Sequence, residues 1–103
     1  MILERIAWDE AGTPTERDLL GRLEADGFEA FAWEDAPGAD YQPHAHDHDE
    51  SLWVIAGEIT FGAGGEDYRL GPGDRLMLPR GTVHTARAGR DGARYLIGQR
   101  ITA

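Results

Sequence analysis

The stretch Pro43–Gly57, which reads PHAHDHDESLWVIAG, decides how the rest of the chain is interpreted. Three histidines and one glutamate fall within seven residues of it, and an apolar segment follows them directly. Side chains two apart on a β-strand share a face, so we expect His44 and His46 to point at one spot. The polar segment Asp47–Asp49 favours a chain reversal, after which Glu50 opens the next strand.

These residue types suit a metal ion. A carboxylate on the following strand can meet the two imidazoles of the preceding one, and such a mixed nitrogen and oxygen set suits a divalent transition metal. The chain has four histidines, and the one outside this stretch is His84, in the segment Pro79–His84, PRGTVH. We expect His84 to supply the other half of the site.

At these spacings the chain resembles the cupins. The first cupin motif reads G-x5-H-x-H-x3-E-x6-G, and its matching residues are Gly38, His44, His46, Glu50 and Gly57. The resemblance therefore implies that the two histidines and the glutamate are metal ligands.

The second cupin motif reads G-x5-P-x-G-x2-H-x3-N, and its matching residues are Gly73, Pro79, Gly81 and His84. Ala88 stands where the motif ends in asparagine, so we expect a local polar contact to be missing. With both motifs together, the resemblance implies one divalent ion (Fe, Mn, Ni, Co or Zn) held by His44, His46, Glu50 and His84.

The resemblance also implies a fold. We expect a mainly all-β protein, a double-stranded β-helix or jelly-roll barrel, with one amphipathic helix near the N-terminus. Residues 1–103 are predicted to form a single cupin domain. In it, residues 1–27 hold the first strand and the helix, and residues 28–103 form the barrel, with the motifs at 38–57 and 73–88.

The helix has recognisable start and stop signals. Thr13 is expected to be its N-cap and Pro14 its first residue, and Gly27 is expected to end it. Leucines at helical spacing between them predict a face that packs on the sheet: Leu19, Leu20 and Leu23.

Short apolar or alternating segments separated by glycine-rich turns predict the strands. An edge strand is expected within Ile2–Trp8, and the β pattern resumes at Phe28. The further predicted strands are Pro43–Asp47, Ser51–Ala56, Glu58–Gly62, Glu66–Leu70, Arg75–Leu78, Thr82–Ala88 and Ala93–Ile101. Such a run of short strands indicates a sandwich or barrel.

Strand alternation places two apolar residues, Trp53 and Ile55, on the face opposite Leu52 and Val54. One of these pairs must face away from the barrel interior, which indicates a covered outer surface. We expect a homodimer to cover it, with an isolated exposed tryptophan as the alternative.

The amino-acid composition limits the kinds of metal site and binding partner that are expected. The chain has 103 residues, no cysteine and a formal net charge of −9. The absence of cysteine excludes disulfides and thiolate metal sites, and the negative charge disfavours nucleic-acid and membrane partners. The sequence holds no apolar run of signal-peptide or membrane-span length, so we expect a cytoplasmic protein. The cupin resemblance implies a small-molecule ligand or substrate.

The remaining polar residues of this stretch are not expected to bind the metal. His48 is expected to lie in the turn or on the rim and not to be a ligand. Asp47 and Asp49 are expected to be solvated, with a hydrogen bond to a ligand imidazole as the alternative. Strand alternation leaves open which of six polar residues line the pocket: Tyr41, Gln42, Tyr68, Arg75, Tyr95 and Gln99.

Two classes of function remain open. The first is a metal-dependent enzyme, an oxygenase or isomerase that acts on a small polar organic molecule; the second is a non-catalytic domain that binds or senses a small molecule. An enzyme predicts an accessible metal with a proton donor or acceptor nearby, whereas a binding domain predicts a closed or purely apolar pocket. A structural module with an empty site is a third possibility.

Overall fold

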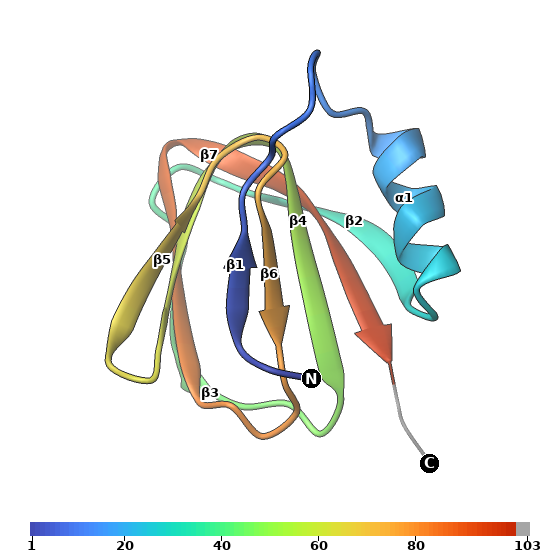
Figure 1. Ribbon diagram of the computed structural model, residues 1–103. Coiled ribbons are helices and arrows are strands. Elements are labelled where there is room, and N and C mark those ends of the chain that lie inside the picture. The colour runs from blue at the N-terminus through green and yellow to red at the C-terminus, as the bar shows by residue number, and fades with distance from the viewer. Residues whose placement is uncertain (101–103) are drawn as a thin grey trace.

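Figure 1 shows the computed structural model, which describes residues 1–100 as strands with one helix on the outside. In chain order the elements are β1 (Glu4–Ile6), α1 (Glu16–Ala25), β2 (Glu29–Asp35), β3 (Asp40–His44), β4 (Asp49–Ala63), β5 (Glu66–Leu70), β6 (Arg75–Leu78) and β7 (His84–Arg100). The predicted class, mainly β with one N-terminal helix, is confirmed.

The strands form one seven-stranded antiparallel sheet in the order β1-β6-β4-β7-β2, with β3 pairing β7 and β5 pairing β4. Two long strands, β4 and β7, run through both halves of it. The first part of β4 pairs β6 and its last part pairs β5; β7 pairs β3 at its start and β2 at its end. The sheet therefore folds over on itself as a jelly roll, but it does not close (Figure 1).

The continuity of these long strands corrects the sequence analysis, which expected two strands in place of each. The predicted strands stop on either side of Gly57 and Gly92, yet β4 and β7 pass through both glycines with φ of 75° and 76°. Ladder shifts flank Gly57, so the chain bends there as a bulge without losing its partner. A Cβ at Gly57 would collide with the Gly92 carbonyl, so the two bends pack closely only because residue 57 is glycine. Ile101, the predicted end of β7, lies outside the described residues.

Helix α1 begins two residues later than predicted. The N-cap is Thr15, whose hydroxyl accepts a hydrogen bond from the Asp18 N–H at 3.3 Å, so the prediction of Thr13 was wrong. Gly27 follows the C-cap residue Asp26 with φ of 89°, in the left-handed conformation that ends helices.

The helix covers the outer face of the sheet. Its Leu19 and Leu23 are fully buried and cluster with Phe28, Trp53 and Leu96, whereas Leu52 and Val54 belong to the cluster between the sheet halves. The apolar outer face predicted around Trp53 is thus covered by the chain's own helix. A homodimer stays a prediction, without support from this face.

Two shorter elements also differ in extent. Strand β1 is limited to Glu4–Ile6, paired with β6, within the expected Ile2–Trp8. Strand β3 ends at His44, earlier than the predicted Pro43–Asp47. Within residues 1–100, no helix has the length and apolar character needed to cross a membrane.

Candidate metal centre

Three imidazoles meet where β3 ends and β7 begins. His44 and His84 are partners across the β3–β7 ladder, and their ring centroids lie 4.3 Å apart. The His46 ring centroid lies 4.9 Å from that of His44 and 5.2 Å from that of His84. One ring nitrogen from each residue falls within 4.8 Å of the others, a group that could hold a metal ion. We call these three residues the imidazole cluster.

His46 reaches the cluster from a loop and not from a strand, which corrects the sequence analysis. The loop is held in place because the Gly81 N–H donates a hydrogen bond to the His46 carbonyl at 2.9 Å. Gly81 has φ of 78°, a conformation that glycine adopts without strain. The turn of the second motif thus holds the loop of the first.

Backbone carbonyls orient two of the rings. The Nδ1–H of His44 donates to the Gln42 carbonyl at 2.7 Å, and the Nδ1–H of His84 donates to the Thr82 carbonyl at 2.9 Å. A carbonyl only accepts, so Nδ1 carries the proton and the Nε2 lone pair of each ring is free for a metal. Burial of His84 also lowers its pKa, which favours the neutral imidazole that a metal requires.

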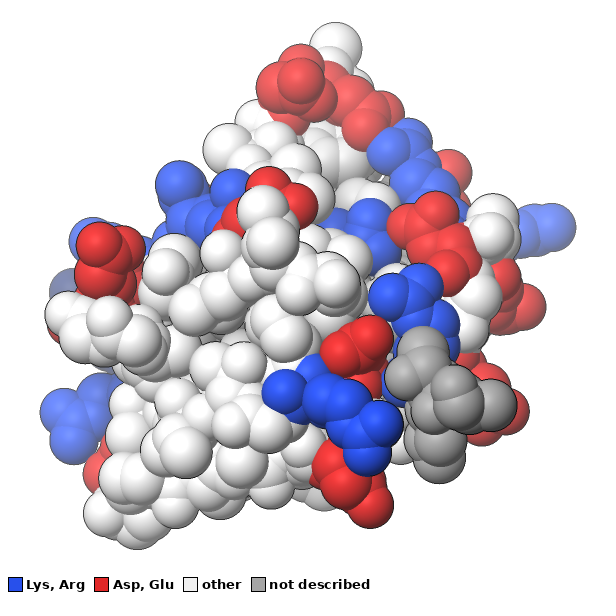
Figure 2. Space-filling view, turned by 60° about the horizontal axis from the view of Figure 1, so that its bottom comes forward, with Lys and Arg blue, Asp and Glu red and all other residues white. Residues whose placement is uncertain are grey.

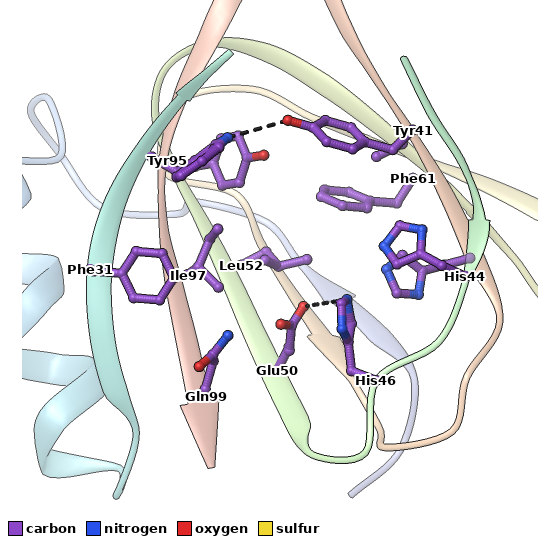
Figure 3. Close-up of a pocket in the computed structure, with 13 residues that line it drawn as sticks. Phe31, Tyr41, His44, His46, Glu50, Leu52, Phe61, Tyr95, Ile97 and Gln99 are labelled. Atoms are coloured by element: carbon purple, nitrogen blue, oxygen red, sulfur yellow. Dashed lines mark hydrogen bonds and ion pairs between the residues drawn. The ribbon is translucent and has the colours of Figure 1, made fainter. Parts of the chain in front are cut away.

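Glu50 lies beside the cluster but has another partner. Its side chain comes from the start of β4 and is 5% exposed, with Oε1 3.7 Å from His46 Nε2 (Figure 3). Its Oε2 lies 3.0 Å from His48 Nε2, so His46, His48 and Glu50 form a second group that could hold a metal. The two groups share His46, and the four expected ligands do not form a single group.

His48 is therefore more than a turn residue. Its ring stacks on that of His46 with centroids 5.2 Å apart, and its side chain is only 14% exposed. Its contact with Glu50 was not predicted, although the spacing of two residues between them was a usable signal.

The two aspartates of this segment differ. Asp47 is solvated as expected, with 93% of its side chain exposed. Asp49 is not: its carboxylate accepts the Arg80 N–H at 2.8 Å and lies 3.6 Å from the Arg100 guanidinium. The hydrogen bond from Arg80 and the charge of Arg100 lower the Asp49 pKa, and the contact joins the start of β4 to the turn before β7.

A cavity of about 240 Å³ adjoins the imidazole cluster and Glu50 (Figure 3). Of the six polar candidates, Tyr41, Tyr95 and Gln99 line it. Gln42 and Tyr68 do not. Most of the remaining lining is aromatic or aliphatic, with Phe31, Leu52, Phe61 and Ile97 among it.

Arg75 lies on the other side of the sheet, under the helix. Its guanidinium donates to the Ser51 hydroxyl at 2.6 Å and to the Asp26 carboxylate at 3.0 Å, and it sits 4.4 Å from the centroid of the Trp53 ring. It is 8% exposed and joins the helix end to the sheet. Its role is in packing and not in the cavity.

A buried carboxylate that the sequence analysis did not select organises the side of the cavity away from Gln99. Asp35, 6% exposed, accepts hydrogen bonds from the Tyr95 hydroxyl at 2.7 Å, from Trp33 Nε1 at 3.0 Å and from the Tyr41 hydroxyl. Burial and this carboxylate raise the pKa of Tyr95, so its phenol stays protonated. We call Trp33, Tyr41 and Tyr95 the aromatic end; the alternation of Phe31 and Trp33 with two alanines was the signal for part of it.

Comparison with known proteins identifies the family of this site. The family model described as Cupin domain matches residues 31–97. Quercetin 2,3-dioxygenase of Bacillus subtilis (strain 168) is 31% identical over 78 residues, which are 74% of this chain and 23% of that protein. The chain thus spans about a quarter of the length of this curated relative.

Solved structures similar to this chain agree with the match to the cupin family model. The DMSP lyase DddQ from Ruegeria pomeroyi DSS-3 has 31% identity and a TM-score of 0.66, covering 74% of this chain and 41% of that one. KdgF from Halomonas sp. has 31% identity and a TM-score of 0.61, covering 72% and 70%. The Schizosaccharomyces pombe Cnp3 cupin domain, at 15% identity, covers 97% of this chain and 64% of that one with a TM-score of 0.67, and shows the fold alone. With the family match over residues 31–97 and two motifs that meet at one site, the chain belongs to the cupin superfamily.

Proposed function

We propose that this cupin is a metal-dependent enzyme acting on a small organic molecule, with one divalent transition-metal ion held by His44, His46, Glu50 and His84. The observation that carries the proposal is the imidazole cluster beside an accessible cavity. Free Nε2 lone pairs on His44 and His84, fixed by carbonyls, fit the ion's need for oriented, neutral ligands. Glu50 would join them by exchanging its contact with His48 for the ion.

An ion held by these four residues would supply Lewis-acid chemistry or, where it is redox-active, oxygenation chemistry. The residues that line the cavity would bind and orient the ligand. The apolar walls exclude water around a bound molecule, Gln99 offers an amide donor near Glu50, and the tyrosines at the aromatic end offer hydroxyl groups.

The relatives support an enzyme of this broad kind. One is named a dioxygenase and another a lyase, and this chain covers 23% and 41% of their lengths. We therefore carry over only the class, an enzyme that acts on a small molecule, and neither individual reaction. The metal in the proposal rests on the imidazole cluster.

The alternative of a non-catalytic binding domain predicts a closed or purely apolar pocket. The cavity opens to solvent, and Glu50, Gln99 and Tyr41 line it. These polar groups favour the enzyme, because a ligand held by apolar contact alone would not need them.

Two measurements test the proposal. Elemental analysis after incubation with Fe, Mn, Ni, Co or Zn should give one ion per chain, and Glu50→Ala should weaken binding by at least the 10- to 100-fold typical of losing an outer partner. The control Glu66→Ala, at the exposed start of β5, should bind normally.

The second measurement separates enzyme from binding domain. Protein loaded with Mn(II) should enhance the relaxation of water protons, because an enzyme site keeps an exchangeable position on its ion. A bound ion without such enhancement would contradict the proposed catalysis, and no uptake of any of the five metals would support a structural module.

A further inference from the structure

One wall of the cavity is built in rungs that change from polar to aromatic along the strands. On β7 the inward side chains are Gln99, Ile97 and Tyr95, two residues apart. Across the β4 and β2 ladders, Gln99 pairs with Glu50, Ile97 pairs with Leu52 and Phe31, and Tyr95 pairs with Trp33. This wall therefore offers polar side chains near the imidazole cluster, an apolar middle and then the aromatic end.

The opposite wall repeats the order. His44 and His84 form one rung of the β3–β7 ladder, and the next inward rung holds Tyr41 and Ala86 with Phe61 of β4. In Figure 3 the labelled rings of Tyr41 and Phe61 lie across the cavity from those of Tyr95 and Phe31. Aromatic side chains thus stand on both sides of the same space.

Asp35 fixes this aromatic end. Its three donors come from β2, β3 and β7, so one buried carboxylate ties both walls together. Because the Trp33, Tyr41 and Tyr95 side chains are oriented by these hydrogen bonds, their ring faces are held in place before a ligand enters. Such preorganisation reduces the entropy lost on binding.

The charges near the cavity exclude some ligands. Within residues 1–100, the side chains bordering the cavity include no arginine, and the sequence has no lysine. Figure 2 shows a broad uncharged area on the face that includes the bottom of Figure 1, with basic and acidic side chains beside it. Phosphate esters would find no cation away from the metal, whereas a neutral ring system suits the lining.

The dimensions of the cavity limit the size of the ligand. Tyr95 and Gln99 are four residues apart on one strand, about 13 Å at the rise of an extended chain. A volume of about 240 Å³ lies just below the usual range for drug-sized ligands, so one small molecule fits.

We propose that the ligand is a small, flat, unphosphorylated aromatic molecule whose ring lies between the Phe31 and Tyr95 wall and the Tyr41 and Phe61 wall, with an oxygen-bearing end toward the imidazole cluster. The orientation of that end rests on the proposed function. The ring subsite does not, because it consists of side chains that need no metal.

The test uses metal-free protein, so that its failure is distinct from a failure to bind metal. Isothermal titration calorimetry compares 2-naphthol with decahydro-2-naphthol, which has the same carbon count and one hydroxyl but puckered rings. Aromatic pairing predicts that 2-naphthol binds about 2- to 12-fold more tightly. Equal binding, or tighter binding of the saturated probe, would overturn the proposal.

A variant locates the subsite. Phe31 is 44% exposed, so Phe31→Leu should fold normally, and it should remove most of the preference for the flat probe. Tyr68→Leu, which removes a ring that does not border the cavity, should leave the preference unchanged. A preference that survives Phe31→Leu, or disappears in Tyr68→Leu, would place the ring elsewhere and contradict the assignment.

Discussion

Replacing Asp35 is the perturbation whose cost can be worked out most fully. Its carboxylate is 6% exposed and accepts three hydrogen bonds, of which the one from Tyr95 is buried. Asp35→Ala leaves that hydroxyl without an acceptor, at a cost of about 1–3 kcal/mol. The bonds from Trp33 and Tyr41 are partly exposed, so water can replace part of their contribution.

The total loss in the free energy of unfolding should be about 3–5 kcal/mol, because three hydrogen bonds to a carboxylate are lost at about 1.5–3 kcal/mol each and water replaces part of two of them. Asp35→Asn keeps one acceptor oxygen and should cost less, about 1–2 kcal/mol. Since a domain of this size is stabilised by about 5–15 kcal/mol, the alanine variant should lose a large fraction of its stability.

Urea unfolding at pH 7, followed by circular dichroism, measures both variants. Asp91→Ala is the control, because this side chain is 82% exposed and its loss should change stability by no more than about 0.5 kcal/mol. If Asp35→Ala unfolds at the same urea concentration as Asp91→Ala, the carboxylate does not hold the aromatic end together and the reasoning is refuted.

Three further predictions concern the fold. Gly57→Ala should lower the melting temperature far more than Gly12→Ala, because both have positive φ but only the Cβ at position 57 would collide with a backbone carbonyl of β7; equal losses would show that conformation alone matters. Thr15→Ala should cost about 1 kcal/mol in urea unfolding and Thr13→Ala almost nothing, and the reverse order would restore the sequence-based helix start. Because the pKa of Tyr95 is raised in the folded state, its protonated phenol stabilises the fold below the ordinary tyrosine pKa near 10, and this stability is lost as the pH rises above that value. Absorbance at 295 nm should therefore show Tyr95 ionising only when the protein unfolds. Full ionisation near pH 10 in folded protein would contradict its burial.

The sequence predicted what depends on short-range spacing. The ladder pairing of β3 with β7 brings His44 and His84 together, whereas His46 reaches them from a loop and Glu50 contacts His48. That His44, His46, Glu50 and His84 hold one ion stays a prediction. Strand alternation separated Leu52 and Val54 from Trp53 and Ile55 but did not decide which pair faces the interior; the structure places Leu52 and Val54 there. Alternation also could not decide what covers the opposite face, which depends on where the helix docks.

Features that depend on contacts between distant parts of the chain could not be predicted from the sequence. Asp35 stands in a segment of turn residues, and its buried partner Tyr95 lies 60 positions away. Gly57 looked like the end of a strand because glycine favours breaks and bends alike, and only its contact with Gly92 makes it a bend. Thr13 and Thr15 both satisfy the rules for an N-cap beside a proline, so local preference did not separate them.

The central claim is that one ion binds at the imidazole cluster with Glu50, and not at the second group formed by His46, His48 and Glu50. The direct measurement is the metal content per chain of His84→Ala and His48→Ala, each incubated with Zn(II) or Co(II), desalted and analysed. The proposal predicts near-complete loss of the ion in His84→Ala and about one ion per chain in His48→Ala. An ion retained in His84→Ala and lost in His48→Ala would place the metal in the second group and contradict the proposed centre.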